Sequence, residues 1–103
     1  MANPNAFMPT GDNTTTAMTV ASSAAVAIPT PERGDSLRIV NDAAAKAFIR
    51  FGNDSGMAAA TAADIPLVPN SVEVMRKPPQ VTHYRVILAS GTGTLHVGVG
   101  EGV

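Results

Sequence analysis

The sequence predicts an all-β protein, built as a small β-sandwich or jelly-roll-like barrel with an extended N-terminal arm. Two observations lead to this class. Apolar and polar residues alternate in several short runs, which is the pattern of strands with one buried face. Clusters of Gly, Pro and Asn separate these runs at intervals of roughly 10 to 15 residues, a spacing typical of sandwiches and barrels.

The N-terminal third differs in composition from the rest of the chain. Residues 1–35 are rich in Ala, Thr, Ser, Asn and Pro, and the prolines favour extended backbone around them. We predict an arm over 1–35 with short strands near 14–20 and 24–28, followed by a β domain over 36–103. Such an arm lies against its own sheet or against a partner. On this interpretation, a chain without residues 1–30 keeps a folded body.

The β domain is expected to contain at least four alternating strands. In each of them, apolar side chains recur at every second residue, so one face of each strand is expected to be buried. The runs cover residues 36–41, 71–75, 83–89 and 94–100. The side chains predicted to share buried faces are Leu37 with Ile39, Val72 with Val74, Tyr84 with Val86 and Leu88, and Leu95 with Val97 and Val99.

Residues 37–54 allow two interpretations. In the first, a short helix over 43–51 follows a strand, but it would carry Lys46 and Arg50 as a like-charged pair one turn apart. In the second, Asn and Asp form a turn that joins two strands in a hairpin. We favour the hairpin, which places Ala45, Ala47, Ile49 and Phe51 inward and Lys46, Phe48 and Arg50 outward.

The outer face of this hairpin is a candidate contact surface. Exposed aromatic and Arg side chains are enriched at protein interfaces. The alternative is a solvated strand face with one half-exposed Phe. A second candidate is the arm, which could add a strand to the sheet edge of a neighbouring subunit. The candidate contact residues are Arg38, Lys46, Phe48 and Arg50.

Composition excludes several classes of function. The chain has 103 residues, enough for one domain, with three Phe, one Tyr and no Trp, so its core is expected to be thin. The formal net charge of −1 lacks the basic excess of a nucleic-acid binder. No run reaches the roughly 18 apolar residues that a membrane span needs. Residues 17–29 are small and apolar, but no Lys or Arg precedes Arg33, so the basic part of a signal peptide is missing.

No catalytic or metal-binding pattern is visible. With no cysteine, the chain has neither disulfides nor thiolate ligands. His83 and His96 are the only histidines, and neither has the spacing of a metal or catalytic motif. The glycines of residues 91–102 alternate along a strand and lack the Lys-Ser/Thr that ends a phosphate-binding loop. We therefore expect no enzyme activity, no cofactor and no metal.

The motif order over residues 36–102 resembles that of a small structural protein of tailed bacteriophages. The resemblance is carried by a strand ending in Val40-Asn41 and a return strand over 47–52. A Pro-bounded stretch over 66–74 and the Gly-rich strand over 91–102 complete it. It implies a β-sandwich virion component, a decoration or cement protein that binds and stabilises the capsid shell. Its implied location is the capsid exterior, after assembly in the host cytoplasm.

The same resemblance implies the partners. They are the major capsid protein or other virion subunits, together with further copies of the chain as a homo-oligomer. Nucleic acid and membrane are not expected as partners, on the grounds of charge and composition given above. Two alternatives stay open at this point. One is a structural protein of the head–tail junction or tail, and the other is a carbohydrate-binding module used for adhesion.

Overall fold

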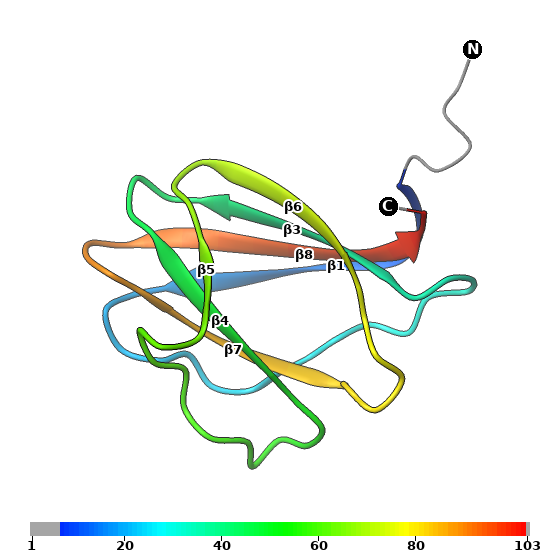
Figure 1. Ribbon diagram of the computed structural model, residues 1–103, viewed down its shortest axis with the longest axis horizontal. Helices are drawn as coiled ribbons and strands as arrows, with labels where there is room; N and C mark the ends of the chain where they lie inside the picture. Colours follow the sequence, from blue (N-terminus) through cyan, green and yellow to red (C-terminus); the bar gives the residue numbers. More distant parts are fainter. Residues whose placement is uncertain (1–6, 103) are drawn as a thin grey trace.

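Two antiparallel four-stranded sheets pack face to face as a sandwich (Figure 1). The computed structural model describes residues 7–102, of which 52% lie in strands and none in a helix. The all-β prediction is therefore confirmed. The strands are β1 (Met8–Met18), β2 (Val26–Ala27), β3 (Ser36–Asp42), β4 (Ala47–Gly52), β5 (Ile65–Leu67), β6 (Ser71–Arg76), β7 (His83–Leu88) and β8 (Gly93–Glu101).

Successive strands lie in different sheets, except β4 and β5, which both belong to sheet B. Sheet A has the order β1-β8-β3-β6, and sheet B has the order β2-β7-β4-β5. Strand β1 pairs with β8, β2 with β7, β3 with β6 and β4 with β5, all antiparallel. Two further antiparallel pairs, β3 with β8 and β4 with β7, join these ladders into sheets.

The inner faces of the sheets form one apolar core. Its strand residues alternate with outward residues, as the period of two requires. The predicted inward faces of β3, β7 and β8 are confirmed. Core residues that the sequence pattern identified are Leu37, Ile39, Ala47, Ile49, Tyr84, Val86, Leu88, Leu95, Val97 and Val99.

Strand β6 is turned the other way from the prediction. Val72 is 52% exposed, and the partly buried Met75 packs against the core instead. The register explains this orientation, because Val72 lies opposite Val40 and Val74 lies opposite the exposed Arg38. The alternation was predicted correctly, but the choice of face was wrong.

The turn over residues 43–46 joins strands in different sheets. No helix forms over residues 43–51. Ala47 and Ile49 point inward, as the two-strand interpretation predicted. However, the hairpin prediction is wrong, because β3 pairs with β6 and β8, whereas β4 pairs with β5 and β7. Buried Asn41 holds this crossover in place, since its Nδ2 donates to the carbonyls of Ala45, Leu67 and Val68 at 3.1, 3.0 and 3.1 Å.

Most of the N-terminal segment belongs to the sandwich. Strand β1 forms an edge of sheet A, and Met18 at its end is only 1% exposed. Strand β2 forms an edge of sheet B. An arm separate from a body over 36–103 is therefore not confirmed for residues 7–35, and the part of the predicted arm before residue 7 lies outside the described residues.

One lateral side of the sandwich is closed. The hydroxyl of buried Tyr84 lies 2.9 Å from Thr14 Oγ1 and 2.7 Å from Thr16 Oγ1. These side-chain hydrogen bonds join β7 to β1 across the core. The N–H of Leu88 donates to the carbonyl of Thr19, and that of Ser23 donates to the carbonyl of Val86. The chain thus crosses from sheet A to sheet B while hydrogen-bonded along β7.

Candidate interaction surface

The four predicted contact residues do not share one face. Arg38 points outward from sheet A, where it is exposed between Val74 and Gly98 on the neighbouring strands. Phe48 and Arg50 point outward from sheet B, and Lys46 is exposed just before β4. Since β3 and β4 lie in different sheets, the predicted single row is wrong. Arg38 lies on one side of the sandwich, and Lys46, Phe48 and Arg50 lie on the other.

Arg50 is used within the molecule. Its Nε donates to Asp64 Oδ1 at 3.0 Å and Oδ2 at 3.2 Å, which ties the loop between β4 and β5 to the outer face of sheet B. Partial burial acts to raise the pKa of Asp64. The N–H of Thr61 and the Arg50 guanidinium outweigh that effect, so the pKa lies below its ordinary value of 3.8.

A second arginine fixes the loops over sheet B. Arg85 lies opposite Arg50 in the ladder, and it donates to the carbonyl of Ser23 at 2.7 Å and to that of Met57 at 2.9 Å. The N–H of buried Ala60 donates to Ser22 Oγ at 2.9 Å, so the two loops also bond to each other. The outer face of sheet B is thereby partly covered by the chain itself.

Phe48, like Arg50, has neighbours within the molecule. It is half-buried on the outer face of sheet B, between Ile87 on β7 and Pro66 on β5. It is outside the core, as the prediction of a contact residue required. Its neighbours in the sheet are apolar, however, so the side chain already has internal packing partners.

Replacing Asp64 is expected to loosen this loop. We expect Asp64→Asn to lower the free energy of unfolding at pH 7 by about 0.5–1.5 kcal/mol, since a part-buried, charge-assisted hydrogen bond is lost. Because the pKa of Asp64 is depressed in the folded state, its contribution is present above pH 3.8 and is lost as the pH falls through the folded value. The difference between variant and wild type should therefore shrink below about pH 4.

Urea unfolding followed between pH 2 and 7 measures this difference. Asp12→Asn, at an exposed carboxylate of β1, is the matched control and should leave stability unchanged. Equal stability of Asp64→Asn and wild type at pH 7 would contradict the anchoring role.

The outer face of sheet A is more accessible. Arg38 and Thr15 are exposed on it, and the half-buried His96 lies between Val40 and Thr15 on the neighbouring strands. Gly98 continues this row without a side chain. Val40, Val72 and Val74 form an apolar patch along its β3–β6 side. We call this surface the sheet A face.

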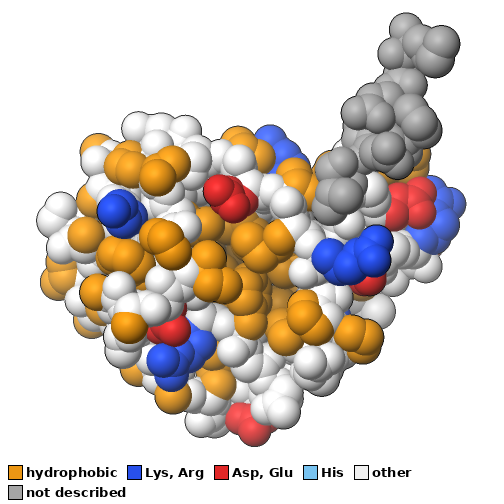
Figure 2. All heavy atoms as spheres, viewed as in Figure 1, with side chains coloured by type: hydrophobic (Ala, Val, Ile, Leu, Met, Phe, Trp, Pro, Cys, Tyr) orange, Lys and Arg blue, Asp and Glu red, His pale blue; other side chains and the backbone are white. Residues whose placement is uncertain are grey.

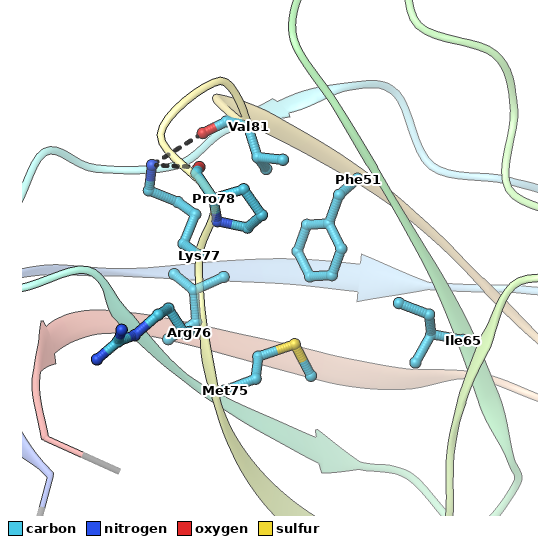
Figure 3. A pocket seen from close by; sticks show the side chains of 8 residues that line it. Phe51, Ile65, Met75, Arg76, Lys77, Pro78 and Val81 are labelled. Atoms are coloured by element: carbon cyan, nitrogen blue, oxygen red, sulfur yellow. Dashed lines mark hydrogen bonds between the residues drawn. The ribbon is translucent and has the colours of Figure 1, made fainter.

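The side of the sandwich between β5 and β6 is open. An apolar cleft of about 240 Å³ lies there. Figure 2 shows hydrophobic side chains gathered in the hollow at the centre of the view. In Figure 3, Phe51, Ile65, Met75 and Val81 point toward one another across this space. Lys77 closes one end, where its Nζ donates to the carbonyls of Pro78 and Val81 at 3.3 and 3.0 Å.

Comparisons with protein-family models, curated proteins and solved structures found no match to this chain. Within residues 7–102, no group of three or more His, Asp or Glu side chains is placed to hold a metal ion. In the same described range, no helix has the length and apolar character to cross a membrane. Assignment of function therefore depends on the sandwich and on its accessible surfaces.

Proposed function

We propose that this chain is a non-enzymatic virion structural protein, a decoration or cement protein that binds and stabilises the capsid shell of a tailed bacteriophage. The observation that carries the proposal is the strand pairing. The pairs β1–β8, β2–β7, β3–β6 and β4–β5 are those of one long hairpin rolled up, which supports a jelly roll. Jelly rolls occur in viral capsid and lectin domains. The motif order over residues 36–102 supports the virion role independently.

The sheet A face is the surface that we assign to the shell. A protein that binds a preformed lattice needs a rigid surface whose side chains lose little conformational freedom, and on this face Thr15, the three valines and Gly98 are short residues held on strands. Arg38 supplies an accessible positive charge on it. The outer face of sheet B has less accessible surface, because loops cover part of it and Arg50 is paired with Asp64.

Charge reversal at two exposed residues tests the location of the contact. Arg38→Glu is expected to weaken binding to undecorated capsids at least about tenfold, since a charge at an interface is replaced by its opposite. Lys46→Glu makes the same change beside sheet B and should bind as wild type does. Occupancy is measured by mixing purified protein with undecorated heads and separating them by centrifugation.

The binding results test the proposed contact surface and the proposed capsid role separately. If the wild type and Arg38→Glu bind heads but Lys46→Glu does not, the sheet A face is rejected as the contact surface, while the capsid role is kept. No binding of the wild type to heads would reject the capsid role itself. Labelled localisation on intact particles by electron microscopy distinguishes the head–tail or tail alternative, because a shell protein is present in many more copies than a protein on the tail axis.

A carbohydrate-binding function remains the candidate of another class, because lectins also use jelly rolls. Sugar sites commonly present an exposed aromatic ring. Here the only Tyr, Tyr84, is fully buried, and the chain has no Trp. Selective binding on a glycan array would support that alternative against the capsid role.

A further inference from the structure

Within residues 7–102, strand β6 presents a long edge that no other strand covers. Strand β2 has two residues, and β5 has three, including Pro66, which cannot donate to a ladder. The edge of β1 is partly used, since its Thr10 carbonyl accepts from the N–H of Glu32. Strand β6 has six residues, contains no Pro, and forms the end of sheet A in the described part of the chain. Such an edge is a template for another strand.

The direction of the free backbone groups follows from the ladder between β3 and β6. The N–H of Lys77 donates to the carbonyl of Asp35, so these residues form a hydrogen-bonded pair that continues the β3–β6 register. Bonded and non-bonded pairs alternate in an antiparallel ladder. Val72, Val74 and Arg76 therefore direct their N–H and C=O groups away from β3, toward solvent.

We propose that β6 binds β6 of a second copy of this chain in antiparallel orientation, with Val74 facing Val74 across a two-fold axis. This register pairs Val72 with Arg76 of the second copy and uses the free backbone groups of all three residues from both chains. An isologous contact of this kind closes after two subunits. The proposal stands without the virion role, because it rests on the edge alone.

The side chains of β6 are self-complementary in this register. On the sheet A face, Val72 and Val74 of each copy meet in one apolar cluster, which covers Val72, now 52% exposed. On the cleft side, exposed Glu73 lies opposite Met75 of the second copy and diagonally next to both its Lys77 and its Glu73. A parallel arrangement would instead set Glu73 beside Glu73. The antiparallel arrangement thus avoids directly opposed glutamates and pairs Glu73 with a lysine, and the apolar cluster favours a second copy.

Sedimentation equilibrium of the full chain tests the pairing. We expect the wild type to be a dimer. Val74→Lys, which places two lysines opposite each other on the axis, should raise the dissociation constant at least about tenfold. Thr15→Lys adds the same charge to the sheet A face on the far edge strand and should leave the dimer intact. Circular dichroism shows whether each variant is folded. If Val74→Lys is not, Val72→Lys replaces it, because it brings a lysine next to Arg76 of the second copy.

Cross-linking tests the register. The chain has no cysteine, so Val74→Cys introduces a single thiol. The two Cα atoms of a directly opposite bonded pair are about 5.5 Å apart, within the range of a disulfide. Mild oxidation should link Val74→Cys into covalent dimers, and Thr15→Cys should form no covalent link between subunits. A wild type that is monomeric up to about 1 mM, or a dimer that Val74→Lys leaves unchanged, would overturn the proposal.

Discussion

A chain that begins at residue 31 is expected not to fold. The truncation removes β1 and β2, so β8 and β7 each lose a paired neighbour. It also removes Met18, which is 1% exposed, and loss of a buried Met side chain alone costs about 2–5 kcal/mol. Small domains have about 5–15 kcal/mol of stability in total. The hydroxyl of Tyr84 would in addition lose Thr14 and Thr16 as partners.

Heteronuclear NMR and thermal unfolding measure this effect. The truncated chain should show narrow amide dispersion and no cooperative transition. A chain that lacks only residues 1–6 keeps all of β1 and is the matched control, which should unfold cooperatively. A cooperative transition of the chain that begins at residue 31, close to that of the wild type, would restore the interpretation of residues 1–35 as a separate arm.

The same segment shows the limit of sequence patterns, because strands were predicted near 14–20 and 24–28, where β1 and β2 overlap them, but their places in the two sheets were not. The inward faces of β3, β7 and β8 were predicted because large aliphatic residues alternate with polar ones. Strand β1 has no such signal, since its inward side uses Thr14 and Thr16, whose hydroxyls bond to Tyr84 across the core. Threonine is a strand-forming residue, so the Thr14–Thr16 run was the available signal for a strand. A polar contact between residues so distant in sequence leaves no periodic pattern.

The candidate site was predicted less well than the fold, for reasons of connectivity. A turn that joins two strands looks the same in sequence whether the strands pair or lie in opposite sheets. Arg38 and Phe48 were therefore assigned to one surface, whereas the crossover separates them. The pairing of Arg50 with Asp64 was missed because Asp64 lies in the loop before β5. Strand β5 has three residues, too few for an alternating pattern to indicate it.

Replacement of Asn41 by Asp is expected to destabilise the protein by about 3 kcal/mol or more at pH 7. Asn41 is 1% exposed, and its Nδ2 donates to the three carbonyls that join the crossover to β5 and the residue after it. A carboxylate at this position has no hydrogen to donate. It would place a buried negative charge against three carbonyl oxygens, which is worse than the loss of the hydrogen bonds alone.

Two companion variants separate these causes. Asn41→Ala removes the donor without adding charge, and we expect it to lower the free energy of unfolding by about 2 kcal/mol, less than Asn41→Asp does. Asn53→Asp makes the same chemical change at an exposed position and should be neutral. Chemical unfolding at pH 7 ranks the three variants. Equal losses for Asn41→Ala and Asn41→Asp would show that charge against the carbonyls contributes nothing.

The free energy of unfolding of the Asn41→Asp variant is expected to depend on pH in its own way. Burial beside carbonyl oxygens disfavours the charged form, so the pKa of the new carboxyl should be raised above the value of about 3.9 in the unfolded chain. The unfolded state then releases the proton more readily, and the destabilisation grows as the pH rises above that value. Below it, the protonated acid can donate one hydrogen bond to a carbonyl of the crossover. The deficit relative to wild type should therefore be smallest near pH 3 and largest at pH 7, whereas the deficit of Asn41→Ala should not change with pH.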